Sequence, residues 1–96
     1  MSGLEVVIED ARGCARLFRL GRDVEAGLAM VAMVEAAQPF VELMPGDVQS
    51  SWGGLLGLMF NDQQAQNWLS LADYLEFELV ELLTSGSGGL SLFSLR

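Results

Sequence analysis

Residues 24–37 contain eleven apolar side chains and only two charged ones, Glu25 and Glu35. At 100° per residue, the apolar side chains point to every side of a helix, and a helix that is apolar all round is one that other protein surrounds. We therefore expect a helix over 23–38 at the centre of a bundle. Asp23 can cap its start, and Pro39 should end it because proline disfavours helical geometry in the residue before it.

Helical spacing also appears at the N-terminus. Apolar residues recur every three or four positions over 3–20, and Ser2 followed by Glu5 matches a capping box. Gly21 is then well placed as a left-handed stop. Taken alone, 4–8 is also compatible with a short strand. We favour the helix.

A third helix is expected after a tight turn at 44–47, with Asp47 as its cap. Its apolar residues form one narrow stripe, made of Val48, Trp52, Leu55 and Met59. Gly53 and Gly57 lie on the other side, four residues apart, a spacing that lets two helices touch. We therefore expect close packing at these glycines.

Asn61 and Gln64 form another cap pattern, which opens a helix over 62–83. The Gly/Ser-rich stretch after it is typical of a flexible linker. Residues 90–95 then alternate partly like an edge strand and either fold back onto the molecule or stay free. The predicted fold is all-α: a bundle of about four helices over 1–84, followed by a flexible Gly/Ser segment and apolar tail over 85–96.

The charge is strongly one-sided. The chain has 13 acidic residues and five arginines, for a net charge of −8, and its ten carboxylates between 23 and 95 are accompanied by no Lys, Arg or His. Such a surface repels nucleic acid and anionic membranes and attracts basic proteins. Hydrophobic residues make up 51% of the chain. We therefore expect a protein partner or a homodimer to cover apolar surface.

Several locations and chemistries are disfavoured. The chain has no unbroken apolar run of about 18 to 20 residues and no cationic region before an apolar stretch, so neither a membrane span nor a secretory signal is expected and the chain reads as cytoplasmic. Without histidine or lysine, most familiar active sites are missing. No phosphate-binding loop occurs. Cys14 reads as a buried structural residue. We expect no cofactor, no metal and no enzymatic activity.

The predicted binding surface lies on the last helix. Tyr74 and Phe77 fall opposite its apolar arc, beside Glu78 and Glu81. Exposed aromatic residues surrounded by acids suit the docking of a basic protein. The alternative is that another helix or the C-terminal tail covers both aromatic side chains.

Glu76 falls inside the apolar arc of the same helix, where an unpaired charge would be costly. It is a candidate for a buried ion pair with Arg12 or Arg16; otherwise it lies at the wet border of the arc. Arg12, Arg16 and Arg19 form a stripe on the first helix. This stripe can be a salt-bridged solvent face, can dock against the acidic remainder of this chain or a second copy, or, less favourably, can bind phosphate.

These features predict a small acidic helical module that binds a basic or apolar-surfaced protein, as an inhibitor, an immunity or antitoxin-type protein or a chaperone does. One alternative is a self-assembling structural subunit without enzymatic activity. A minor alternative is a carboxylate-metal hydrolase. The pairs Asp73 with Glu76 and Glu78 with Glu81 resemble the acid pairs of helical nucleotide hydrolases, but they point to different sides of one helix.

Overall fold

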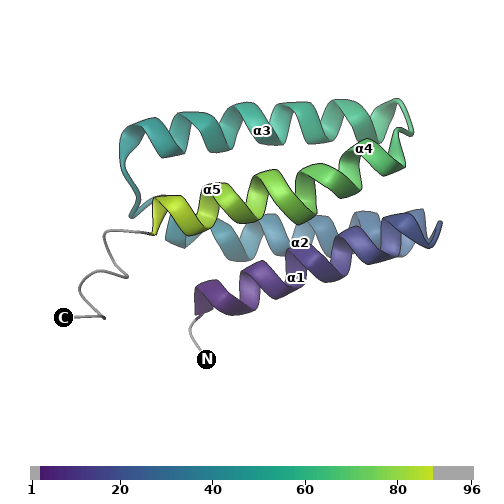
Figure 1. The fold of residues 1–96 in the computed structure, drawn as a ribbon, viewed down its shortest axis with the longest axis horizontal. Helices are drawn as coiled ribbons and strands as arrows, with labels where there is room; N and C mark the ends of the chain where they lie inside the picture. Colours follow the sequence, from purple (N-terminus) through teal and green to yellow (C-terminus); the bar gives the residue numbers. More distant parts are fainter. Residues whose placement is uncertain (1–2, 88–96) are drawn as a thin grey trace.

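The computed structural model describes residues 3–87, and these form an all-α bundle of four helical rods (Figure 1). The first three rods are α1 (Gly3–Arg19), α2 (Asp23–Val41) and α3 (Gly46–Gln64); the fourth is continuous through α4 (Trp68–Asp73), η1 (Tyr74–Glu78) and α5 (Leu79–Gly86). Successive rods run in opposite directions (Figure 1). The predicted fold class is confirmed.

Helix α1 ends in a Schellman motif at Gly21, as the glycine predicts. Gly21 has a φ of 78°, its amide donates to the Phe18 carbonyl over 3.1 Å, and the Arg22 amide donates to the Leu17 carbonyl over 3.0 Å. Residues 4–8, for which a strand was the alternative, are helical. Ser2 of the predicted capping box lies outside the described residues.

Helix α2 does not end before Pro39 as predicted but continues to Val41. Proline removes one amide donor and costs helix stability, yet the last turn places Val41 in the core with 2% of its surface exposed. Phe40 also packs against α1, so near Gly3 that a β-carbon there would lie 2.6 Å from the ring. Burial of these two side chains offsets the proline. At the other end, Asp23 is the first helical residue and not the cap.

The prediction that α2 is surrounded by protein is wrong. Val24, Leu28 and Val31 are 76%, 72% and 48% exposed, whereas the buried residues of the helix form a single stripe. In a bundle of four rods, α2 packs against α1 and less extensively against α3, and these neighbours reach only one side of it. Under a criterion that tolerates Glu25 and Glu35, α2 is also the one helix within 3–87 long and apolar enough to cross a membrane; 28% of that segment is buried.

Helix α3 begins at Gly46, with Pro45 at the cap position that was expected for Asp47. Its predicted apolar stripe is confirmed, with Trp52 and Met59 buried and Val48 and Leu55 packed at the edge of the core. The predicted close packing at Gly53 and Gly57 is wrong, because a β-carbon at either glycine would meet no atom within 4 Å. The stripe holds α3 against the fourth rod and leaves its glycine side facing outward.

The corner between α3 and α4 lies six residues later than predicted, because α4 begins at Trp68 and not at residue 62. Helix α3 runs through Asn61 and Asp62 to Gln64, so the residues that read as a helix start are a helix end. The corner is a second Schellman motif: Gln66 has a φ of 58°, its amide binds the Gln63 carbonyl over 3.2 Å, and the Asn67 amide binds the Asp62 carbonyl over 2.9 Å. A glutamine here takes the position that glycine usually holds.

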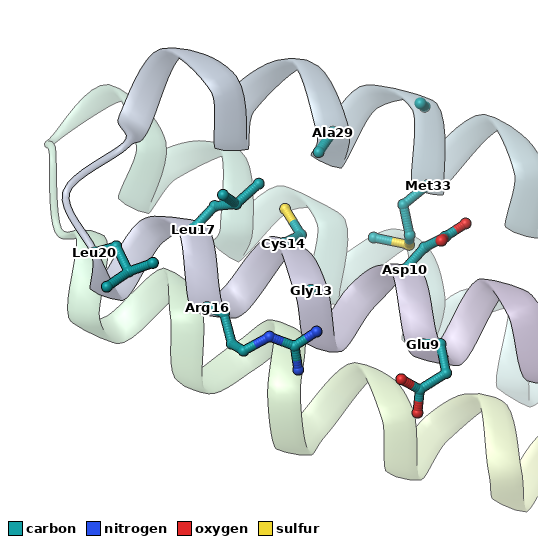
Figure 2. A pocket seen from close by; sticks show the side chains of 10 residues that line it. Glu9, Asp10, Gly13, Cys14, Arg16, Leu17, Leu20, Ala29 and Met33 are labelled. Atoms are coloured by element: carbon teal, nitrogen blue, oxygen red, sulfur yellow. The ribbon is translucent and has the colours of Figure 1, made fainter.

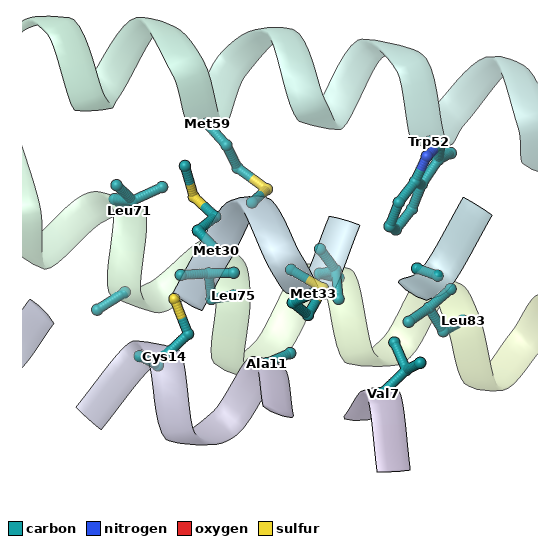
Figure 3. Packing of buried hydrophobic residues seen from close by; sticks show 14 of the residues in the cluster. Val7, Ala11, Cys14, Met30, Met33, Trp52, Met59, Leu71, Leu75 and Leu83 are labelled. Carbon is teal, nitrogen blue, oxygen red and sulfur yellow. The ribbon is translucent and has the colours of Figure 1, made fainter. Parts of the chain in front are cut away.

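The fourth rod contributes the spine of the core. Leu71, Leu75, Leu79 and Leu83 are fully buried at a spacing of four residues. Figure 3 shows three of them, Leu71, Leu75 and Leu83. That spacing is accommodated by the π-helical segment η1, whose wider turn shifts the helix phase. Phe18 of α1 stacks on Trp68 at the start of α4, with ring centroids 5.5 Å apart.

The rod ends at Gly86, two residues beyond the predicted domain boundary at 84, and Ser87 is buried. A β-carbon at Gly86 would lie 2.6 Å from the sulfur of Met44 and 2.8 Å from a methyl group of Val48. The end of α5 therefore touches the turn that leads into α3. The predicted tail over 90–95 lies outside the described residues.

Candidate functional site

The four predicted binding residues lie together on the fourth rod and form what we call the acidic-aromatic surface: Tyr74, Phe77, Glu78 and Glu81. Phe77 is 57% exposed, and both glutamates are exposed. Tyr74 is only partly accessible because its ring packs against the edge of the core. Phe77 is therefore the aromatic side chain that a partner can reach.

The π-helical segment carries three of these residues. Residues 74–78 are η1, and a single π-helical turn inside an α-helix is a feature frequently found at functional sites. Next to it, Glu78 and Glu81 line a shallow groove with Leu82 and Ser85, of about 210 Å³. A docking side chain would meet two carboxylates and the apolar side chain of Leu82 in this groove.

The charges around this surface are unevenly neutralised. Glu78 and Glu81 take part in no ion pair within residues 3–87. Asp73 and Glu76, by contrast, both bind the Arg19 guanidinium of α1, Asp73 over 2.7 Å. Among the described residues the potential at Glu78 and Glu81 is therefore negative, and such a potential attracts cations.

The ion pair of Glu76 differs from the expected one. Its partner is Arg19, not Arg12 or Arg16, and about a third of the Glu76 side chain remains exposed. Arg12 instead binds Glu9 over 3.0 Å within α1, and Arg16 has no ion pair among the described residues. The α1 arginines thus divide their roles. One supports its own helix, and one ties α1 to the fourth rod.

A second surface was not located by sequence reasoning. Val24, Leu28 and Val31 fall at i, i+4 and i+7 on the outer side of α2, and Glu35 continues the stripe one turn further. We call these four residues the α2 face. The available signal was the apolar character of α2 on all sides, which we read as burial inside this chain.

A groove of about 710 Å³ runs between α1 and α2 (Figure 2). Leu17 and Cys14 of α1 face Ala29 and Met33 of α2 across it, and Glu9, Asp10 and Arg16 contribute charged groups. The Cys14 thiol is buried as predicted and donates to the Ala26 carbonyl over 3.2 Å. Burial raises the pKa of Cys14 to about 12. A thiol held protonated in this way is structural.

Two further polar features are the acid pair on the fourth rod and Asp62 at the corner between α3 and α4. Among residues 3–87 no cluster of three or more Cys, Asp or Glu side chains is arranged to hold a metal ion. In particular, Asp73 and Glu76 share an arginine. Asp62 is a buried carboxylate, but Ser70 and Asn67 bind it over 2.6 Å and 3.5 Å, so it stabilises the corner.

Searches against models of protein families, against curated proteins and against solved structures found no match for this chain. The assignment of a function therefore depends on the surfaces described above.

Proposed function

We propose that the protein is a small acidic helical binding module of the cytoplasm, without enzymatic activity, that docks a basic protein on its acidic-aromatic surface. The observation that carries the proposal is Phe77, a large aromatic side chain that is more than half exposed beside two carboxylates that form no ion pair within residues 3–87. Aromatic anchors dominate many binding interfaces, and flanking charges steer the partner and raise its association rate. Inhibitors, immunity proteins and chaperones use this combination.

The test compares capture of proteins from the native cell extract by the tagged wild type and by two surface variants, at low and at high salt. Phe77→Ala removes the anchor, and Glu81→Lys reverses one flanking charge. Both should lose a basic protein that the wild type retains at low salt, because loss of a central anchor costs about 2 kcal/mol or more of binding. High salt should release the same protein from the wild type.

Matched controls sit elsewhere on the molecule. Leu69→Ala removes an apolar side chain that is 70% exposed, and Glu42→Lys reverses an exposed charge outside the surface. Both controls should retain the partner. The proposal would be contradicted if all four variants captured the same protein or if high salt did not release it. It would also be contradicted if the wild type captured no protein.

A second candidate function, a self-assembling structural subunit, is supported by a different observation. The α2 face leaves Leu28 72% exposed in the middle of an apolar stripe. Soluble monomers seldom leave such stripes uncovered. The carboxylate-metal hydrolase has no comparable support within residues 3–87, where Arg19 occupies the space between Asp73 and Glu76.

A further inference from the structure

We infer that the protein forms a homodimer through helix α1, which lies antiparallel against α1 of a second copy about a two-fold axis at Gly13. Arg16 of each copy binds Glu9 of the other. The surface used is the α1 face, made of Val6, Glu9, Gly13, Arg16 and Leu20. It is separate from the acidic-aromatic surface and from the α2 face, so the inference can fail or succeed independently of the proposed function.

The centre of the α1 face is an apolar stripe with a glycine in its middle. Val6, Gly13 and Leu20 are seven residues apart, so they fall within about 40° of one another around the helix. Val6 is 44% exposed and Leu20 is 72% exposed. Both are seven residues from Gly13. In an antiparallel pair with its axis at Gly13, Val6 of each copy therefore lies level with Leu20 of the other.

Nothing within residues 3–87 requires a glycine at position 13. Glycine inside a helix lowers its stability relative to alanine. A β-carbon on Gly13 would meet only a guanidinium nitrogen of Arg16, on the same helix, at 3.6 Å. The missing side chain does, however, let another backbone approach α1 closely. The groove beside Gly13 is bordered on the α2 side by the small residues Ala29 and Ala32, so α2 leaves room for a second helix.

The charges of the α1 face are complementary to themselves. Glu9 lies four residues before Gly13 and Arg16 three residues after it, and both fall on the same side of the stripe, within about 60° of Gly13. Figure 2 shows both side chains on the side of α1 away from α2. The two-fold axis keeps a side chain on its side of the stripe and reverses its position along the helix. Each Arg16 therefore lies level with Glu9 of the other copy, to within a rise of about 1.5 Å.

Both charged groups can make this contact. Arg16 is exposed and takes part in no ion pair within residues 3–87. Glu9 binds Arg12 through one carboxylate oxygen, Oε1, and its side chain is 52% exposed. The other oxygen, Oε2, can accept a hydrogen bond from a second guanidinium group, because a carboxylate accepts through both of its oxygens.

The opposite charges also decide what kind of partner fits. A basic partner would place like charge against Arg16, and an acidic partner would place like charge against Glu9. The face requires a helix with an acid and a base seven residues apart, running in the opposite direction. Within residues 3–87, every arginine that lies in a helix lies on α1. A second copy therefore supplies this helix, and the interface uses the same patch on both subunits.

The decisive experiment is a charge swap read out by molecular mass. Sedimentation or light scattering of the purified wild type over a range of concentrations should show a dimer. Arg16→Glu and Glu9→Arg should each raise the dissociation constant about tenfold or more, because each places like charges together at two symmetric positions. The double variant carrying both changes should return to within about threefold of the wild type, since the pairs are restored in reverse.

Net charge is controlled within the same set of variants. Arg12→Glu makes the same change of charge on the same helix as Arg16→Glu, but outside the α1 face, and should leave the dissociation constant within about threefold of the wild type. Glu9→Arg makes each copy less acidic and so weakens the general repulsion between two acidic chains. A tighter dimer in Glu9→Arg would therefore overturn the inference.

A second pair of variants tests the close approach at Gly13. Gly13→Gln should give a monomer with an unchanged helical circular dichroism spectrum, because glutamine is the better helix former and only the flexible Arg16 lies near the added side chain. The matched control Gly54→Gln, on α3, has nothing within 4 Å and should remain a dimer. A wild type that is monomeric at every concentration would overturn the inference. A dimer that survives Gly13→Gln would overturn it too, as would a double charge variant no tighter than the single ones.

Discussion

Ser70 donates a hydrogen bond of 2.6 Å to the carboxylate of Asp62, and this contact joins the first turn of α4 to the last turn of α3. Asp62 is 9% exposed, and its side chain also faces the Asn67 amide group. Replacing it by alanine leaves the Ser70 hydroxyl without its acceptor. We expect Asp62→Ala to lower the free energy of unfolding by about 2 kcal/mol, measured by urea titration with tryptophan fluorescence. The exposed neighbour Asn61→Ala should change it by less than about 0.5 kcal/mol; equal effects would show that the contact contributes nothing specific.

Gln66 adopts a left-handed backbone conformation with a φ of 58°, which costs a residue with a side chain about 1 kcal/mol. Gln66→Gly should therefore raise the free energy of unfolding by up to about 1 kcal/mol. Gln64→Gly is the matched control, because Gln64 is helical and exposed, and there glycine should destabilise by a similar amount. If thermal or urea unfolding shows that Gln66→Gly and Gln64→Gly change the free energy of unfolding in the same direction, the backbone at Gln66 is not strained.

Replacing Gly86 or Gly54 by alanine should change the free energy of unfolding in opposite directions. At Gly86 a β-carbon would press on Met44 and on the stiff, branched Val48, so Gly86→Ala should lower the free energy of unfolding by about 1 to 3 kcal/mol. At Gly54, in the middle of α3, nothing lies within 4 Å, so alanine should raise it by about 0.5 to 1 kcal/mol. A stabilised Gly86→Ala variant would mean that α5 does not approach the turn before α3 this closely.

Cys14 should be almost unreactive in the folded protein. With its pKa raised to about 12, roughly one thiol in ten thousand is ionised at pH 8, and the ring of core residues around it blocks access. Labelling with an aromatic disulfide reagent should be at least about a hundredfold slower in buffer than in concentrated urea, given the small thiolate fraction. Rapid labelling of the native protein would show that the α1–α2 groove opens readily.

The same pKa has a consequence for stability at high pH. Between the ordinary value of 9.0 and about 12, the unfolded chain releases the thiol proton while the folded chain keeps it. The unfolded state therefore binds fewer protons, and the free energy of unfolding must fall as the pH rises through this window. Cys14→Ala should remove this part of the decline. If the free energy of unfolding falls with pH equally in the wild type and in Cys14→Ala, the thiol does not cause this part of the decline.

The two Schellman corners show why one helix end was predicted and the other was not. Both have the same pair of backbone hydrogen bonds, from Gly21 and Arg22 in the first and from Gln66 and Asn67 in the second. A glycine in the sequence predicts a residue with a left-handed backbone conformation, whereas a glutamine does not. The second corner is held by the contacts of Asp62 with Asn67 and Ser70, and no glycine marks it in the sequence.

The candidate site was partly predictable for a related reason. The position of Phe77 outside the apolar arc follows from helical periodicity and agrees with its exposure. Helical periodicity did not predict the ion-pair partner of Glu76 or the partial burial of Tyr74. The reason is that η1 shifts the phase of the rod within this stretch. The α2 face was misread for a different reason. Periodicity shows that every side of α2 is apolar but not how many neighbours the bundle provides.

The short corners of this bundle bear on how fast the chain folds. The three connections between rods span only 20–22, 42–45 and 65–67, so each rod contacts the next one along the chain, α2 and α3 least extensively; α1 in addition packs against the fourth rod. Little loop entropy is lost before these contacts form, and helical proteins dominated by such local contacts fold within microseconds to milliseconds. We expect stopped-flow refolding of the described helices to be complete, or nearly so, within the dead time of mixing. Any slower phase that depends on protein concentration would then report association of copies and not the formation of the bundle.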